Sequence, residues 1–223
     1  MDRNFQRITF LFLVLGLLFM ALGYWGRWIS HPVAGLNILG VDLPEYVKFV
    51  PEARYGIIPT NRLVFFAMPV TLALGLILLA SLQKPLPLWA RGLAGLLAIP
   101  VALSMLPPAW TPGLLMTPEF RIQTLVLMAL ITATFLIPLW RHILPDLWRG
   151  LLLVVIAILP QFAFNTFGKL RPAIEKLYNQ PLHNGAGYFF TILGMVFLAL
   201  SGLMLIRLSQ KTQSPPHPPS SGE

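Results

Sequence analysis

Six apolar stretches, each close to the length that a helix needs to cross a bilayer, dominate this sequence. A transmembrane helix takes about 20 mostly apolar residues. The chain has 223 residues, of which 11% are charged, against roughly 25% in soluble domains. These proportions exclude an ordinary soluble domain and indicate one polytopic membrane domain. The expected helices cover residues 8–28, 63–82, 89–106, 122–140, 148–167 and 188–208.

The middle of each expected helix lacks Asp, Glu, Lys and His. Ion-coupled carriers, proton pumps and voltage sensors place ionisable groups there in spite of the energetic cost. A proton-coupled mechanism through the centre of the bundle is therefore not expected. The histidines fall in connections or in the C-terminal segment, so a haem held by two buried histidines is not expected either. They are His31, His142, His183 and His217.

The residues that usually carry chemistry form no recognisable motif. The absence of cysteine excludes disulfides, thiolate nucleophiles and cysteine-ligated metals. The spacing of His31 and His183 resembles no metal-ligand motif, and the serines lack a G-x-S-x-G setting. We therefore expect no catalytic residue, metal or cofactor. The net charge of +8 comes from basic residues that flank apolar stretches, which indicates contact with a lipid bilayer rather than with nucleic acid.

The distribution of basic residues predicts the orientation. The N-terminus, the second and fourth connections and the C-terminal segment are short and carry Lys and Arg with few acids. The other connections are longer and mix basic with acidic residues. The positive-inside rule then places both termini in the cytoplasm. The lack of an N-glycosylation sequon agrees with a bacterial inner membrane, so we expect a plasma-membrane protein of bacterial type.

All six tryptophans lie at or next to an expected helix end, which is typical of residues at the membrane interface. The alternative is that some of them pack in the protein core. These residues are Trp25, Trp28, Trp89, Trp110, Trp140 and Trp148.

The connection between the first two expected helices has a helical pattern of its own. Asp42 and Glu45 lie at capping-box spacing, and Pro51 is expected to end the helix. The apolar face of this helix consists of Leu43, Tyr46, Val47 and Val50. A second short amphipathic segment is expected over residues 172–178. Both would lie on the outer side, flat on the interface or over the mouth of the bundle.

The most polar spot inside the expected membrane region lies on the fifth helix. Gln161 and Asn165 are one turn apart with Thr166 beside them, and amides in hydrocarbon need hydrogen-bond partners. One interpretation is a site for a solute or a quinone headgroup. The other is hydrogen bonding between helices, with Ser104, Thr124, Thr132 or Thr134 as partners.

Charged residues in the outer connections form a second candidate site. They can hold an anionic lipid headgroup or an acidic loop of a partner protein. The alternative is that they anchor helix ends at the edge of the hydrocarbon layer. These residues are Arg27, Asp42, Glu45, Arg54, Arg62, Lys169 and Arg171.

Two hairpins, over residues 62–108 and 121–167, share the spacing between an opening arginine and the tryptophan of the next helix. Duplication of a hairpin, as in some transporters, and coincidence both explain this similarity.

The predicted fold is all-α, with six transmembrane helices over residues 1–208 and a disordered, proline-rich cytoplasmic tail over 209–223. Three functions stay open. The leading one is a non-catalytic membrane subunit, assembly factor or anchor that docks a protein partner at its outer loops. The second is a carrier for a neutral or lipidic solute, which would use helices broken by proline. The third is an enzyme that acts on a lipid-linked substrate at the outer face. The sequence predicts no oligomeric state.

Overall fold

The computed structural model describes residues 3–31, 33, 36–82 and 86–213, and these residues are mostly helical. The α-helices are α1 (Arg3–Trp25), α2 (Leu43–Tyr46), α3 (Pro51–Arg54), α4 (Ala67–Ser81), α5 (Leu88–Leu103), α6 (Pro112–Leu115), α7 (Arg121–Phe135), α8 (Ile137–Ile143), α9 (Asp146–Ile158), α10 (Gln161–Tyr178) and α11 (Ala186–Gln213). The short 3-10 helices include η2 (Gly40–Asp42), η3 (Val47–Phe49) and η4 (Arg62–Phe66). The strands are β1 (Arg27–Ser30), β2 (Ile38–Leu39) and β3 (His183–Asn184).

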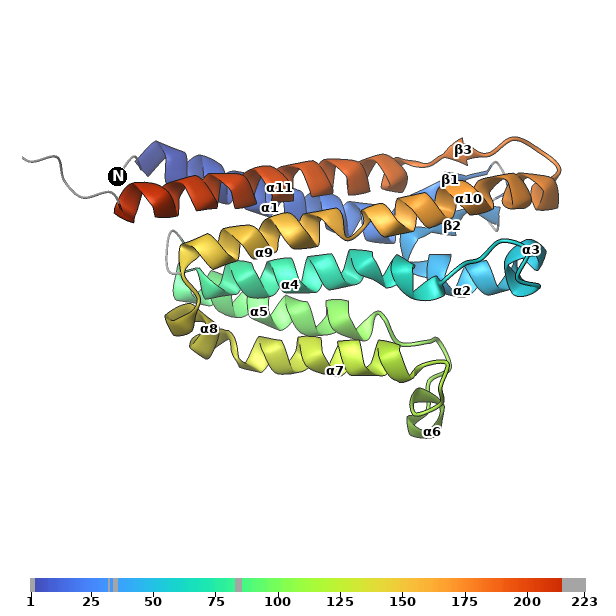
Figure 1. Ribbon diagram of the computed structural model, residues 1–223, viewed down its shortest axis with the longest axis horizontal. Helices are drawn as coiled ribbons and strands as arrows, with labels where there is room; N and C mark the ends of the chain where they lie inside the picture. The colour runs from blue at the N-terminus through green and yellow to red at the C-terminus, as the bar shows by residue number, and fades with distance from the viewer. Residues whose placement is uncertain (1–2, 32, 34–35, 83–85, 214–223) are drawn as a thin grey trace, which may run out of the picture.

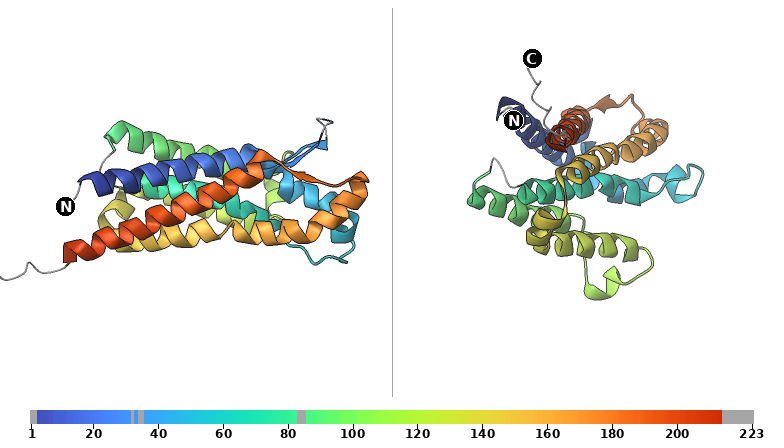
Figure 2. Two further views of the ribbon diagram at one scale, coloured as in Figure 1. Left: turned by 90° about the horizontal axis from the view of Figure 1, so that it is seen from above. Right: turned by 60° about the vertical axis from the view of Figure 1, so that its left-hand side comes forward.

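The long helices run side by side along the longest axis, and the short elements other than α8 gather at one end (Figures 1 and 2). We call this end the cap; it comprises the described residues of 27–66, 104–120 and 168–185. The opposite end, where α1 begins and α11 ends, is called the terminal end. The first and last helices therefore start and finish at the same end of the molecule.

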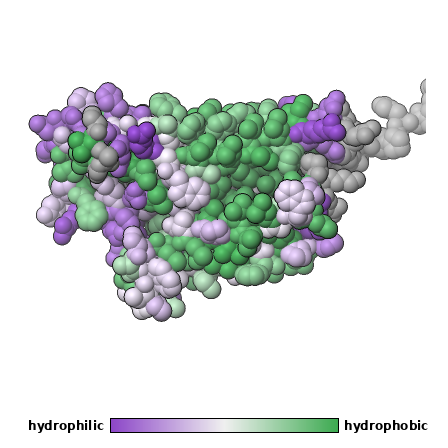
Figure 3. All heavy atoms as spheres, turned by 180° about the vertical axis from the view of Figure 1, so that it is seen from behind, coloured by the Kyte–Doolittle hydropathy of each residue, from purple (hydrophilic) through white to green (hydrophobic). Residues whose placement is uncertain are grey.

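The surface of the bundle between its two ends is apolar (Figure 3). Leu96 on α5, Met128 on α7 and Leu203 on α11 are each at least half exposed. The central helix α4 shows the reverse, because 67% of its most apolar window, within Arg62–Ser81, is buried among the other helices. A broad exposed apolar belt would promote aggregation in water, but it is compatible with insertion in a membrane.

Four helices are long and apolar enough to span a membrane: Asn4–Trp25, Arg62–Ser81, Asp146–Tyr178 and Ala186–Gln210. The pair α7 and α8 passes the same test together but bends by 70° between them. The predicted segment 89–106 coincides with α5, whose 16 residues cover about 24 Å at 1.5 Å per residue. All six predicted segments are therefore helical, whereas length and composition support four spans, or five with the bent pair.

The predicted boundaries of the fifth helix and of the segment 172–178 are wrong. α9 ends at Ile158, and α10 begins after Pro160 and continues through Pro172 to Tyr178. Pro172 removes the hydrogen bond to the carbonyl of Gly168, an exposed residue where solvent can replace that bond. Asn179 ends α10 with a left-handed backbone at φ 51°. The segment 172–178 is thus the end of a long helix, not a separate one.

The all-α prediction misses a small antiparallel sheet in the cap, with strand order β2-β1-β3. The first helix ends at Trp25, earlier than expected, and β1 then pairs with β2 and β3. Trp28 is fully buried in this sheet, and its ring lies 4.8 Å from that of Phe164 and 5.5 Å from that of Tyr188. The interfacial placement predicted for Trp28 is therefore wrong, because an aromatic cluster holds it in the core.

The predicted helix over residues 42–50 is divided into η2, α2 and η3. Its apolar face is confirmed, since Leu43, Val47 and Val50 are buried. The capping role of Asp42 is wrong, because its side chain makes no capping hydrogen bond. Pro51 follows the end of η3 and opens α3.

Two further predictions meet the structure in part. α11 continues through Gln213, past the predicted tail boundary at residue 208, and residues 214–223 lie outside the described residues. The two similar hairpins differ in shape, since α4 leads to α5 without the bend that separates α7 from α8.

Candidate functional site

The predicted intramembrane polar site lies on the surface of the bundle. Gln161 Nε2 donates a hydrogen bond to Asn165 Oδ1 at 3.1 Å, and both residues are exposed. Thr166 beside them is half-buried. Three of the hydroxyls proposed as interhelical partners bond elsewhere: Thr124 donates to the carbonyl of Leu115, Thr134 donates to that of Leu130, and Ser104 bonds to Tyr24. The two amides thus satisfy each other within one helix.

The charged residues predicted in the outer connections all lie in the cap, but the structure does not gather them into one site. Glu45, Arg62 and Arg171 belong to two separate networks of ion pairs within the cap. Arg27, Asp42, Arg54 and Lys169 are exposed, and the ion pairs found among the described residues do not involve them.

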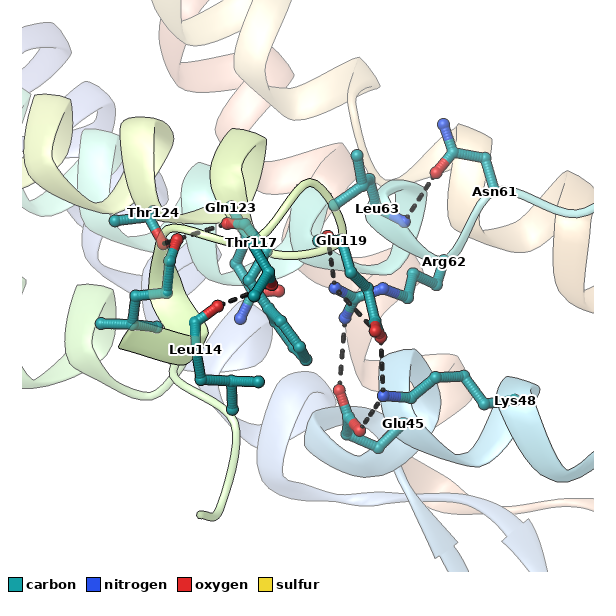
Figure 4. Close-up of polar contacts among 12 residues, drawn as sticks. Glu45, Lys48, Asn61, Arg62, Leu63, Leu114, Thr117, Glu119, Gln123 and Thr124 are labelled. Carbon is teal, nitrogen blue, oxygen red and sulfur yellow. Dashed lines mark hydrogen bonds and ion pairs between the residues drawn. The ribbon is translucent and has the colours of Figure 1, made fainter. Parts of the chain in front are cut away.

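The first network joins three segments of the cap (Figure 4). Lys48 lies 2.6 Å from Glu45 and 3.3 Å from Glu119, and Arg62 lies 3.3 Å from Glu45. Arg62 also donates to the backbone carbonyl of Glu119 at 2.9 Å. The cation of Arg62 stacks over the ring of Phe120 at 4.6 Å, and that of Lys48 at 5.3 Å. The network connects η3 and α2 with η4 and with the loop before α7.

The second network fixes the end of α10 to the strand β3. Arg171 pairs with Glu175 at 3.0 Å, donates to the carbonyl of Leu182 at 2.6 Å and reaches Asn184 Oδ1 at 3.3 Å. Glu175 in turn accepts from the backbone N–H of Leu182 at 3.2 Å. Because one arginine satisfies side-chain and backbone acceptors together, it positions the loop that leads into α11.

A pair of tyrosines adds a third connection within the cap. The Tyr46 hydroxyl donates to that of Tyr178 at 3.2 Å, which donates to the carbonyl of Leu36 at 3.3 Å. Burial and this hydrogen bond raise the pKa of Tyr46 above its ordinary value, so it stays neutral at physiological pH. His31 packs edge-on against the Tyr178 ring at 5.7 Å. These contacts connect α2, the β1–β2 loop and α10.

The ordered cap exposes three large apolar side chains close together in the sequence. Phe49 is 72% exposed, Tyr55 75% and Ile57 71%. Their backbone is fixed, because Tyr55 N bonds to the carbonyl of Pro51 and Ile58 N to that of Glu52, both at 2.9 Å. We call residues 49–57 the tip; it lies at the far end of the cap around α3 (Figure 1).

The tip has the composition of a protein-binding surface. Aromatic residues and arginine are enriched at the centre of such surfaces, and Arg54 is exposed between Phe49 and Tyr55. Beside the tip, Lys176 is 83% exposed and its Nζ lies 3.6 Å from a carboxylate oxygen of Glu52.

Comparison with known proteins assigns no family. The chain matches no family model, no curated protein and no solved structure. The function must therefore be argued from the geometry of the chain itself.

Metal binding finds no support in the described residues, which contain no group of three or more His, Asp or Glu side chains that could hold an ion. His31 Nδ1 instead accepts from the backbone N–H of Val33 at 3.0 Å, and His183 lies on β3 opposite Ser30.

Sequence reasoning missed Phe49, Tyr55 and Ile57. One feature of the sequence could have indicated Phe49. It falls outside the apolar face of Leu43, Val47 and Val50, so a helix that buries this face directs Phe49 away from the cap. Lys48 and Glu119 were missed because ion pairs between distant segments leave no periodic pattern in the sequence.

Loss of the first network is expected to loosen the cap. Arg62→Gln removes a side chain that is only 11% exposed, but Glu119 is 53% exposed, so the cost is about 1 kcal/mol. For a chain of this size that corresponds to a melting temperature about 2–4 °C lower. Thermal unfolding in mild detergent measures the shift, with exposed Arg54→Gln as the matched control. Equal melting temperatures for the two variants would contradict a stabilising role for Arg62.

Proposed function

We propose that the chain is a non-catalytic membrane subunit or anchor that binds a protein partner through the tip on the outer side of the membrane. In this proposal it crosses a bacterial plasma membrane six times with both termini in the cytoplasm. The observation that carries the proposal is the exposure of Phe49, Tyr55 and Ile57 on a cap that is held by ion pairs and a sheet.

Six crossings agree with two features of the bundle. α1 begins and α11 ends at the terminal end, which agrees with an even number of crossings (Figure 1). α5 and the bent pair α7–α8 supply the two segments beyond the four long helices. A short helix spans when the bilayer thins locally or flanking residues extend to the interface.

The charges at the two ends support the cytoplasmic placement of the termini. The exposed or half-buried basic residues of the terminal end include Arg7, Arg91, Arg141 and Arg207. Among the described residues, Asp146 is the carboxylate at this end, and it pairs with Arg149 at 2.6 Å. The other described acids lie in the cap. The cap also carries basic residues, but in longer connections. The positive-inside rule counts Lys and Arg in short connections most heavily, and those connections lie at the terminal end, which supports its placement in the cytoplasm.

A rigid, exposed aromatic patch favours docking over transport. Ordered side chains lose little conformational freedom on binding, which raises affinity. The carrier hypothesis relied on Gln161 and Asn165, which bond to each other on the outer surface of α10.

Site-specific photo-crosslinking in the cells that produce the protein tests the proposal. A photoreactive amino acid at Phe49, Tyr55 or Ile57 is expected to give one adduct of the same discrete mass from each position. Two matched controls are equally exposed: Met116 at 77% on another part of the cap, and Leu88 at 75% at the terminal end.

Neither control position is expected to give that adduct. An adduct of equal yield from Met116 would place the partner elsewhere on the cap, and one from Leu88 would place it on the wrong side. No adduct from any position of the tip would contradict docking there.

A further inference from the structure

A groove at the terminal end combines two arginines with apolar walls. Its volume is about 420 Å³, within the range of roughly 300–1,000 Å³ that is typical of ligand sites. It lies between α5 and the bent pair α7–α8. Apart from Arg91 and Arg141, its lining includes Leu88, Leu96, Ile99 and Ile137.

The groove carries two cations, the guanidinium groups of Arg91 and Arg141. None of the described residues that line it is acidic. Arg91 is positioned by the hydrogen bond from its Nε to the carbonyl of Leu86 at 3.0 Å. The Nε of Arg141 is buried and has no hydrogen-bond partner within the described structure. Because a buried donor without an acceptor is costly, this end of the groove is suited to an anion from outside the chain.

The groove opens sideways onto the apolar belt. Leu88 and Leu96 on its wall are 75% and 64% exposed. Arg91 lies one turn from the start of α5, near the terminal end, whereas Leu96 and Ile99 lie farther along the helix towards the middle of the belt. A ligand that fills the groove therefore has an anionic group near the interface and an apolar part in the hydrocarbon layer.

We propose that this groove binds an anionic phospholipid of the inner leaflet, with its phosphate between Arg91 and Arg141 and an acyl chain along Leu96 and Ile99. Guanidinium groups bind phosphate oxygens in a bidentate manner. Basic pockets between helices on the cytoplasmic side are typical sites for anionic headgroups. The proposal rests on the proposed membrane placement of the bundle, but not on the partner at the tip.

Two variants remove the site by different means. Arg141→Gln removes one cation. The Nε atom of the replaced arginine is buried and has no hydrogen-bond partner within the described structure. Gly92→Leu fills the groove without changing charge, because a Cβ at Gly92 meets no atom within 4 Å. Each has a matched control: Arg207→Gln removes an exposed arginine of the same end, and Gly168→Leu fills equally open space on α10.

The experiment titrates the purified full chain, freed of lipid in mild detergent, with phosphatidylglycerol while its melting temperature is followed. The wild type and both controls are expected to gain stability with the same half-saturating concentration. Arg141→Gln and Gly92→Leu are expected to raise that concentration about tenfold, as the loss of about 1.4 kcal/mol requires. Phosphatidylcholine and inorganic phosphate are expected to give no shift.

Equal responses from a variant and its control would overturn the site. A shift with inorganic phosphate as large as that with phosphatidylglycerol would overturn the lipid as the ligand and indicate a soluble phosphate ester. An equal shift with phosphatidylcholine would overturn the requirement for net negative charge. Flotation of the wild-type chain with vesicles of phosphatidylcholine alone tests the membrane placement independently of all these results.

Discussion

Replacing Gly194 with leucine is expected to lower the melting temperature of the protein by about 6–12 °C, which corresponds to a loss of about 3 kcal/mol. Gly194 lies on α11 where this helix packs closely against α1. A Cβ at this position would lie 2.7 Å from the backbone nitrogen of Met20 and 3.1 Å from the carbonyl oxygen of Gly16. Because these are backbone atoms of α1, the whole helix would have to move.

The matched control is Gly168→Leu, which adds the same side chain to a helical position where a Cβ meets nothing within 4 Å. Its melting temperature is expected to stay at or slightly above that of the wild type, since leucine favours helix more than glycine does. Thermal unfolding in mild detergent, followed by loss of the monodisperse peak in size-exclusion chromatography, compares the two. A Gly194→Leu variant as stable as Gly168→Leu would contradict the close packing of the first and last helices.

The helices could be predicted because the membrane leaves few alternatives. A backbone in hydrocarbon must satisfy its own hydrogen bonds, so each long apolar stretch reads as a helix, and all six expected segments contain one. The positions of the helix ends were harder to predict than the helices themselves. Pro160 and Pro172 look alike in the sequence, yet only the first coincides with a helix end.

The cap was harder to predict because it is built from contacts between distant segments. Strand β1 has only four residues and follows a transmembrane helix directly, so no alternating pattern marks it. The burial of Trp28 depends on Phe164, Phe167 and Tyr188, which lie far along the chain.

The candidate sites also depend on contacts between segments that are distant in the sequence. The sequence predicts Glu45, Arg62 and Arg171 as contacts for a lipid headgroup or a partner, or as anchors of helix ends, whereas the structure engages each of them in ion pairs inside the cap. Burial and pairing with remote partners decide whether a charge is available, and a single sequence reports neither. The exposed tip and the arginine groove became visible only once α3, α5 and α8 were placed in space.

Labelling of single cysteines tests the central claim most directly, namely that the bundle spans a membrane and separates the cap from the terminal end. The chain has no cysteine of its own, so each variant carries one thiol. Met116→Cys lies in the cap away from the tip, and Met116 is 77% exposed. His142→Cys lies on α8 at the terminal end, where the histidine is exposed. Both substitutions leave the packed core untouched.

In intact cells, a maleimide that cannot cross membranes is expected to label Met116→Cys fully and His142→Cys only after the membrane is permeabilised. The bilayer excludes the charged reagent, so the contrast is expected to be nearly complete. Labelling of both positions from the outside, or of His142→Cys alone, would contradict the account.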